Sequence, residues 1–575
     1  MGDRERVVSV PASLEAATDA RLEAWGRERV AERLWARDGS LWSASGKDPG
    51  ELAQWLGWLE LPWTMAERIG ELERLARDVR ADGYTRAAVL GMGGSSLAPE
   101  LFSHLFGDRL GGAAAGSDGL ELRILDSTHP DAVRGFREWA ESARTLFCVS
   151  SKSGSTTEPN AFHAAMAAHA PALDFVAITD PGTVLADLAR AQGFRAIVEG
   201  VPGVGGRYSA LSVFGLLPAA LHGVPLGPLL AGAEAMADLC RAPAPQNPGL
   251  QLGAFLAEAA LAGRDKLTIL TTARMASFGD WVEQLVAEST GKAGRGIVPV
   301  VGEPIGDPDS YGEDRCFVAV TLTGDDDADI TRLASEVRQR GHPVMRIELA
   351  EPAAVGAEFL RWEVAVAAVG IALGIDPFDQ PNVQESKDAT TKLLDVYRRD
   401  GALPAPAPFV AEPGMAAYLD PAALGDEPVS VAGAVRTLLT GAAPGDYVAL
   451  LAYLPSDPDT VAALQRMRSQ IRARLGVATT LGFGPRFLHS TGQLHKGGPD
   501  TGRFLQITAE PARDLPIPGW EESFGTLIAA QALGDLASLQ RRGRHVVRVH
   551  LADASGGLGT LETMIHEMLA TVPAA

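Results

Sequence analysis

Short β-branched runs alternate with stretches of helical periodicity over most of the chain, and this alternation constrains the fold more than any other feature. It begins near residue 80 with RAAVLGMGGSSLAPELFSHLF and continues through TLFCVSSKSGSTTEPNAFHAAMAAHA and DFVAITDPGTVLADLARAQG. Strands that alternate with helices in this way form parallel sheets covered by helices, because each crossover between parallel strands needs a long connection. We therefore predict an α/β protein built on doubly wound parallel sheets.

The chain has 575 residues, which is too long for one hydrophobic core. We expect a helical N-terminal segment (1–75), a first α/β domain (76–240) and a second α/β domain (241–395). A C-terminal α/β extension (396–575) is expected to follow the Pro-rich linker ALPAPAPFVAEPG. Six of the ten tryptophans fall in the N-terminal segment, where we expect them to pack a helical layer onto a larger body.

Charge and composition exclude several classes of function. Lys+Arg 51 against Asp+Glu 72 gives a net charge of −21, which disfavours general binding to nucleic acid or to an anionic membrane. The most apolar stretch (213–236) is interrupted by prolines, so we expect it to be soluble core and not a membrane span. Three distant cysteines and the absence of an apolar signal core at the N-terminus indicate a cytoplasmic protein.

Two turns rich in small hydroxyl residues follow predicted strands and open predicted helices. SSKSGSTTEP begins at Ser150, and GMGGSSLAPE begins at Gly91. A helix N-terminus presents unpaired amide groups and the positive end of the helix dipole, so added hydroxyls there suit a phosphate. Helix capping alone is the alternative, but one hydroxyl suffices for it. We therefore predict a phosphate site that needs neither a metal nor a cofactor.

A dinucleotide-binding fold is a rival interpretation of the first turn. A strand, a glycine turn, a helix and then LRILDS, ending near Asp126, would place that carboxylate on a ribose. The turn departs from G-x-G-x-x-G, however, because Ser96 holds the third glycine position.

Five separated motifs occur in one order: GMGGSSLAPE, SSKSGSTTEP, GVGGRYSALSVFG, LVAESTGK and DQPNVQESK. Over roughly residues 85–390 this set resembles the glucose-6-phosphate isomerase family, whose members contain two sugar-isomerase domains. The later STGQLHKGGPDTGRFLQIT is similar to the isomerase part of fused transaldolase/glucose-6-phosphate isomerase proteins. A transaldolase barrel of ~250 residues would not fit beside it, so we expect a stand-alone isomerase of that branch.

The resemblance implies roles for individual residues. It places the proton-transferring glutamate at Glu288, the active-site arginine at Arg207 and a ring-opening lysine at Lys387. It places the sugar phosphate on a set of small, polar or hydrogen-bonding residues: Gly94, Ser95, Ser151, Lys152, Ser153, Thr156, Gly206 and Gln380.

The chain departs from the family pattern at the ring-opening histidine. In the family a T-x-G-Q-H motif precedes the lysine, whereas here TGQLH, with His495, follows Lys387 by more than a hundred residues. We expect His495 to fill the role, with His489 as the alternative. Gln384 also replaces a glutamate inside the lysine motif. Family members often pair and exchange this histidine, so a homodimer is expected.

These roles suit an aldose–ketose isomerase that interconverts glucose 6-phosphate and fructose 6-phosphate in glycolysis and gluconeogenesis. A carboxylate over two adjacent carbons can move the proton between them, and a fixed arginine can stabilise the enediolate oxygen. The alternatives are a dual phosphoglucose/phosphomannose isomerase, a non-catalytic sugar-phosphate-binding protein and a nicotinamide-dependent dehydrogenase. The isomerase interpretation requires Ser95, Ser151 and Glu288 to face one cavity.

Overall fold

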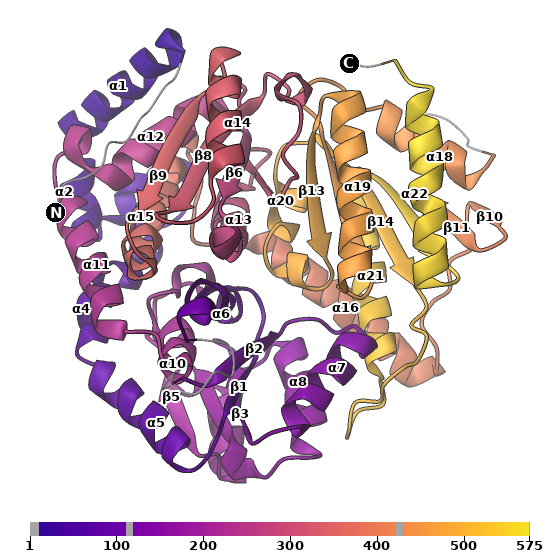
Figure 1. Cartoon of the computed structure of the whole chain (residues 1–575), viewed down its shortest axis with the longest axis horizontal. Coiled ribbons are helices and arrows are strands. Elements are labelled where there is room, and N and C mark those ends of the chain that lie inside the picture. Colours follow the sequence, from indigo (N-terminus) through magenta and orange to yellow (C-terminus); the bar gives the residue numbers. More distant parts are fainter. Residues whose placement is uncertain (1–10, 111–118, 421–428, 574–575) are drawn as a thin grey trace.

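Three sheets of mainly parallel strands, each covered by helices, form the body of the protein (Figure 1). The computed structural model describes residues 11–110, 119–420 and 429–573. The predicted α/β class with doubly wound parallel sheets is confirmed. The first ten residues of the predicted N-terminal segment lie outside the described residues. Each sheet falls inside one of the three expected α/β ranges, whose exact boundaries stay a prediction.

The N-terminal helices form a layer on the helices of the first and second units. Trp25, Trp42 and Trp58 are fully buried in a core that this layer shares with both sheets. The indole N–H of Trp42 donates to the carbonyl of Ala367 at 2.9 Å, so the buried ring has its polar atom satisfied. The helices of this layer are α1 (Ala12–Arg27), α2 (Val30–Trp35), α3 (Pro49–Ala53), α4 (Leu61–Ala66) and α5 (Ile69–Ala81).

The first sheet has the strand order β2-β1-β3-β4-β5, and all its strand pairs are parallel. The chain moves from β1 to one side and then returns to the other side with β3, so the strand order reverses between β1 and β3. The strands are β1 (Arg86–Leu90), β2 (Glu121–Leu125), β3 (Thr145–Ser150), β4 (Phe175–Thr179) and β5 (Ala196–Glu199). The crossover helices are α6 (Leu97–Leu110), α7 (Pro130–Glu141), α8 (Thr157–Ala167) and α9 (Val184–Gln192).

The second sheet repeats the same order, β7-β6-β8-β9, again with parallel pairs. Its strands are β6 (Lys266–Thr271), β7 (Val298–Val301), β8 (Arg315–Leu322) and β9 (Val344–Leu349). Its helices are α13 (Ala276–Thr290), α14 (Ala328–Gln339) and α15 (Val355–Leu373), and three helices connect it to the first sheet: α10 (Val213–His222), α11 (Leu226–Leu239) and α12 (Pro248–Leu261). Helix α16 (Pro381–Asp400) then leads to the third unit.

The third sheet has the order β10-β11-β15-β14-β12-β13. Its four parallel strands, in chain order β12 to β15, repeat the arrangement of the other two sheets, with the reversal between β12 and β14. The strands are β10 (Val410–Glu412), β11 (Met415–Leu419), β12 (Tyr447–Tyr453), β13 (Ala478–Phe483), β14 (Gly502–Ala509) and β15 (His545–Leu551). The helices are α18 (Val431–Thr440), α19 (Pro458–Leu475), α20 (Gly492–Gly497), α21 (Phe524–Arg541) and α22 (Ala554–Ala570).

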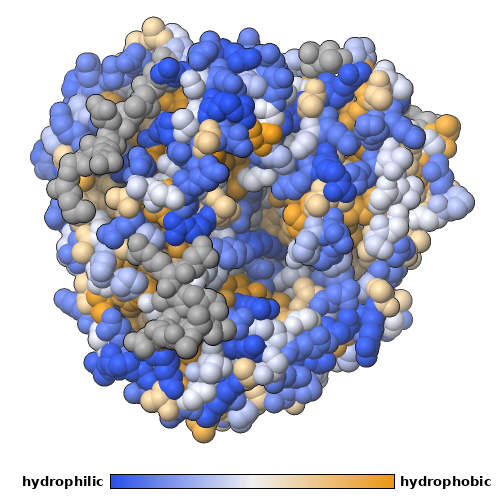
Figure 2. Space-filling view, in the orientation of Figure 1, coloured by the Kyte–Doolittle hydropathy of each residue, from blue (hydrophilic) through white to orange (hydrophobic). Residues whose placement is uncertain are grey.

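The predicted linker is only partly irregular. Residues 402–409 have no regular structure, but VAEPG forms β10 and the turn to β11, which pairs antiparallel with β15. The face shown in Figure 2 is hollowed near its centre, where the three units meet in the orientation of Figure 1. Among the described residues, no helix combines the length and the apolar character that a membrane span requires.

Helix α15 passes so close to α11 that only glycine fits at residue 356. A Cβ atom at Gly356 would overlap the carbonyl oxygen of Leu229, whereas exposed Gly135, within α7, has open space around it. We expect Gly356→Ala to destabilise the protein by ~1–3 kcal/mol through overpacking. Gly135→Ala, the matched control, should be neutral or stabilise by up to ~1 kcal/mol. Urea midpoints followed by circular dichroism measure both effects, and equal midpoints would contradict the proposed close contact.

Candidate active site

A cavity of about 410 Å³ lies where the turns after β1 and β3 meet. Because these two strands are neighbours and the strand order reverses between them, their carboxyl ends open into one crevice. Eleven of the twelve sequence-predicted catalytic and substrate-binding residues line it, and His495 does not: the eleven are Glu288, Arg207, Lys387, Gly94, Ser95, Ser151, Lys152, Ser153, Thr156, Gly206 and Gln380. Ser95, Ser151 and Glu288 thus face one cavity, as the isomerase interpretation requires.

The hydroxyl groups after β3 are not consumed by helix capping. Thr156 is the N-cap residue of α8, but its side chain forms no capping hydrogen bond. It accepts instead from the Ser151 hydroxyl at 3.1 Å. The Ser150 hydroxyl is buried at the cavity wall and has no hydrogen-bond partner among the described residues. These groups and the amides at the start of α8 therefore remain available to an anion.

The other serine and the lysine of this turn are placed differently. Ser153 is exposed, and its hydroxyl lies 3.0 Å from that of Ser155. The Lys152 ammonium forms an ion pair with Asp180, so its charge is already partnered. Burial raises the pKa of Asp180 even beside this cation.

Glycines bring the first turn against the third motif. A Cβ atom at Gly94 would overlap the carbonyl oxygen of Gly206, so the GMGGSS and GVGGR turns touch at a point where only glycine fits. Gly206 itself has open space where a side chain would be. The backbone at Gly206 can therefore approach a ligand closely, whereas Gly94 lets the two turns pack against each other.

Glu288 and Arg207 lie together on the cavity wall and are 7% and 2% exposed, respectively. Glu288 is near the end of α13, and its Oε1 lies 3.5 Å from Nη1 of Arg207. Gln284, one turn earlier, donates to Glu288 Oε2 at 3.1 Å. The carboxylate is thus held from two sides in a nearly dry environment.

Arg207 is fixed by hydrogen bonds along its whole guanidinium. Its Nε donates to the Ser289 hydroxyl at 2.7 Å, and its Nη1 donates to Gln380 Oε1 at 2.9 Å. Its Nη2 donates to the carbonyls of Pro377 and Asp379 at 2.7 and 3.0 Å. These four hydrogen bonds hold the guanidinium in one orientation at the cavity wall.

Helix α16 places two further predicted residues at the cavity. Gln380 precedes its first turn and Lys387 lies two turns along it, exposed at the cavity rim. Gln384, which stands where the family has a glutamate, is exposed and donates to Asp388 at 2.7 Å. It does not line the cavity.

The histidine that lines the cavity is His489. It ends the short 3₁₀ helix η10 (Arg486–His489), and its Nε2 lies 3.0 Å from Oε1 of Glu158. Burial alone would raise the pKa of Glu158, but His489 holds it below its usual range. Gln531 donates to the same carboxylate oxygen at 2.7 Å, and Gln284 donates to the His489 carbonyl at 2.7 Å. Glu158 thus holds the imidazole directly, while Gln531 supports Glu158 and Gln284 holds the His489 backbone.

His495 lies in the core of the third unit, away from the cavity. Its ring is 2% exposed and is surrounded by the aromatic rings of Tyr447, Phe487 and Phe504. Burial, with Lys496 and Arg544 nearby, keeps the pKa of His495 well below its usual value. Lys496 is also buried and pairs with Asp535 at 2.6 Å.

The TGQLH segment connects the ends of two helices that carry cavity residues. Gln493 donates to the carbonyl of Gly291, just after α13, at 2.9 Å. The same side chain accepts from the backbone N–H of Asn382 and donates to its side-chain oxygen, at 2.8 and 2.7 Å. Gly291 and Leu494 pack so closely that a Cβ atom on the glycine would overlap Leu494. This motif therefore sets the position of α16 relative to α13.

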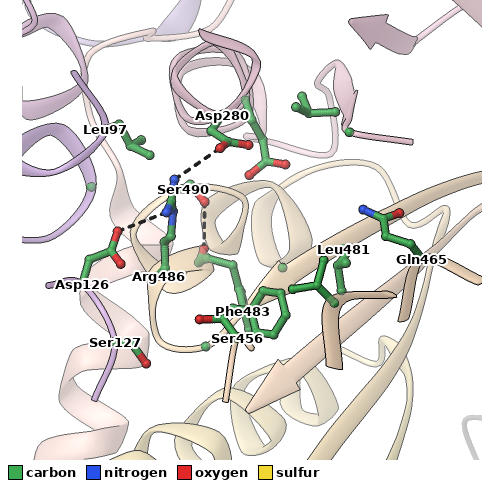
Figure 3. Close-up of a pocket in the computed structure, with 18 of the residues that line it drawn as sticks. Leu97, Asp126, Ser127, Asp280, Ser456, Gln465, Leu481, Phe483, Arg486 and Ser490 are labelled. Atoms are coloured by element: carbon green, nitrogen blue, oxygen red, sulfur yellow. Dashed lines mark hydrogen bonds and ion pairs between the residues drawn. The ribbon is translucent and has the colours of Figure 1, made fainter. Parts of the chain in front are cut away.

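A neighbouring cavity of about 300 Å³ is organised around Arg486 (Figure 3). Its guanidinium pairs with Asp126 at 3.3 Å and with Asp280 at 3.4 Å, and also with Glu100. Burial raises the pKa of Asp280 to about 6 and that of Glu283, on the same helix, to about 8. The dehydrogenase alternative would place the Asp126 carboxylate on a ribose. Because this carboxylate is paired with Arg486, the structure does not favour that role.

Several cavity residues were not identified in the sequence. Trp55, from the tryptophan-rich N-terminal layer, lines the cavity together with Phe378 and Val383. Glu158, which holds His489 without lining the cavity itself, lies inside the SSKSGSTTEP motif, and this is the one local signal that the sequence offered for it. Among the described residues no cluster of His, Cys, Asp or Glu could hold a metal ion.

Comparison with known proteins identifies the family, although no protein-family model matches the chain. It is 30% identical to glucose-6-phosphate isomerase of Symbiobacterium thermophilum over 401 residues, 60% of this chain and 88% of that protein. It is 28% identical to glucose-6-phosphate isomerase of Carboxydothermus hydrogenoformans over 410 residues, 60% and 86% of the two chains.

Two solved structures share the fold. A hypothetical protein from Thermus thermophilus superposes with a TM-score of 0.57 at 24% identity, over 68% of this chain and 100% of that one. A glucose-6-phosphate isomerase from Chlamydia trachomatis gives a TM-score of 0.54 at 16% identity, over 66% and 86%. The sequence identity over most of the length of its relatives, 30% over 88% of the Symbiobacterium thermophilum protein, places the chain in the glucose-6-phosphate isomerase family.

Proposed function

We propose that the protein interconverts glucose 6-phosphate and fructose 6-phosphate. The observation that carries the proposal is the pairing, in one cavity, of a hydroxyl-rich anion site with the Glu288 carboxylate beside Arg207. The family of the chain and the names of its relatives support the same reaction. They favour it over a non-catalytic sugar-phosphate-binding protein.

The phosphate is proposed to bind at the start of α8. Ser95, Ser151 and Thr156 supply hydroxyls, and the α8 N-terminus supplies amide groups and a favourable dipole. The cation within this turn, Lys152, is already paired with Asp180. Neutral donors in a fixed arrangement thus hold the dianion and point the sugar into the cavity.

Glu288 is the proposed base. Its carboxylate removes the proton from C2 of the open-chain aldose and returns it to C1, through an enediolate. Negative charge develops on the neighbouring oxygens during this transfer. Arg207, held by four hydrogen bonds, is already oriented to stabilise that charge without reorganisation.

Ring opening is proposed to use His489, in place of His495, with Lys387. Glu158 holds the His489 ring by its Nε2, in the manner in which a carboxylate orients a catalytic imidazole. His489 belongs to the same chain as Glu288, so the site needs no histidine from a partner. A homodimer and a cytoplasmic location remain part of the proposal, the latter in keeping with three buried free cysteines.

Replacing the proposed base tests the central role. Glu288→Gln keeps the size of the side chain and its contact with Gln284 but removes the proton acceptor. We expect kcat for glucose 6-phosphate to fall by ~10²–10⁴-fold, with binding of a sugar phosphate retained in calorimetry. Glu283→Gln, on the same helix but facing the neighbouring cavity, is the matched control and should stay close to wild type. Wild-type turnover by Glu288→Gln would exclude Glu288 as the base.

The two histidines are separated by comparing a cyclic with an open-chain substrate. A tetrose 4-phosphate cannot close a ring through its phosphorylated oxygen, so exchange of its C2 hydrogen with solvent deuterium reports proton transfer alone. We expect His489→Ala to slow glucose 6-phosphate turnover by at least ~10²-fold more than this exchange. His495→Phe suits its aromatic surroundings and should leave both reactions near wild type. Equal losses on both substrates in His489→Ala would refute the ring-opening role.

A further inference from the structure

A separate cavity of about 280 Å³ lies at the carboxyl end of the third sheet. Its walls come from the ends of β12, β14 and β15, from one face of α21 and from linker residues 403–406. The strand order of this sheet reverses between β12 and β14, so this cavity adjoins the same topological position that the proposed sugar-phosphate cavity occupies in the first sheet. Open parallel sheets bind their ligands at this position. The two cavities share no lining residue.

A buried cation without a counter-ion lines this cavity. Arg548, in β15, is 8% exposed, and its guanidinium carbon lies 4.0 Å from the ring centroid of Tyr418. In the described part of the chain no carboxylate comes within ion-pair distance of Arg548, and its Nε has no hydrogen-bond partner. The Tyr418 ring and the more distant Glu510 interact with the guanidinium, but no carboxylate pairs with it directly, so this arginine is suited to an anion that enters the cavity.

Further polar groups gather beside Arg548. Tyr453, at the end of β12, is 3% exposed, and its hydroxyl lies beside the Asp535 carboxylate, although no hydrogen bond of 3.5 Å or less joins them. Thr508, near the end of β14, shares a hydrogen bond of 3.0 Å with Nδ1 of His550. Glu510 is the acidic group at this cavity; it lies mostly in solvent, 3.8 Å from Nε2 of His550. A few polar groups among apolar walls give a ligand its orientation.

The remaining walls are apolar. Helix α21 presents Ile528, Ala529, Ala532 and Leu533, and the linker closes the opposite side with Leu403, Pro404 and Pro406. The cavity volume is near the lower end of the range for small-molecule pockets. A single arginine suits a monoanion better than a phosphate dianion, which attracts several donors. These features specify a compact ligand with one anionic group and an apolar body.

We propose that this cavity is a second binding site, and that its ligand is a small organic carboxylate with an apolar ring or chain. The carboxylate pairs with Arg548, while the apolar body packs on α21. The site is independent of the proposed isomerase reaction, because none of its residues lines the sugar-phosphate cavity.

The test uses a charged and an uncharged probe of the same shape, 2-naphthoate and 2-naphthalenemethanol, with calorimetry on the full chain. Wild type is expected to bind 2-naphthoate roughly tenfold more tightly than the alcohol, because a charge-assisted pair forms with Arg548. Arg548→Met should remove this preference and leave the affinity for the alcohol unchanged. Ala529→Phe fills the cavity and should abolish binding of both probes.

Folding of each variant is checked by glucose 6-phosphate turnover, which neither substitution touches directly, and by thermal unfolding. If Ala529→Phe does not fold, Arg548→Met and Thr508→Val still report on the cavity. Retained preference for 2-naphthoate in Arg548→Met would overturn the proposal. So would the absence of saturable binding of either probe to wild type up to about 1 mM. Absence of glucose 6-phosphate turnover by the wild type would overturn the proposed function but would leave probe binding unaffected, with thermal unfolding as the remaining check of folding, so the two proposals fail separately.

Discussion

The reversal of strand order between β1 and β3 is the constraint on which the rest of the site depends. Because the two strands are parallel neighbours, the turns that follow them emerge side by side at one crevice. The contact between Gly94 and Gly206 then draws the GVGGR turn into the same crevice. Arg207 enters with that turn, and through its hydrogen bonds it fixes the start of α16. One feature of topology thus assembles residues that lie nearly three hundred positions apart in the sequence.

The chemistry of the proposed reaction divides between the three units. The first unit supplies neutral donors for a phosphate, the second supplies Glu288, and the third supplies His489. The contacts that join these contributions are themselves polar and buried, as in the link from Gln284 to both Glu288 and the His489 carbonyl. A buried amide that bridges two catalytic groups sets their separation more exactly than apolar packing would.

Local sequence predicted the parts of this structure that depend on local physics. The α/β class and the turns at Ser95 and Ser151 follow from periodicity and from the chemistry of helix N-termini. The sequence named His489 only as the alternative to His495, because His489 is held at the cavity by Glu158, which Gln531 contacts in turn, and these contacts span more than three hundred residues. The TGQLH motif pointed to His495, but that ring is enclosed by aromatic side chains that only the folded third sheet brings around it. In the sequence, Trp55 could not be distinguished from the other N-terminal tryptophans, several of which pack the core.

The position of α20 between α13 and α16 has a consequence for how this protein could be shortened. Gln493 joins the end of α13 to the start of α16, and Ala287 and β7 contribute to the same apolar cluster as Phe487 and Leu494. A version cut after α16 would still carry the hydroxyl-rich turns and Glu288. It would lose His489 and expose the apolar residues of α13 and β7 that pack against Phe487 and Leu494. The last third of the chain is therefore an integral part of the folded protein.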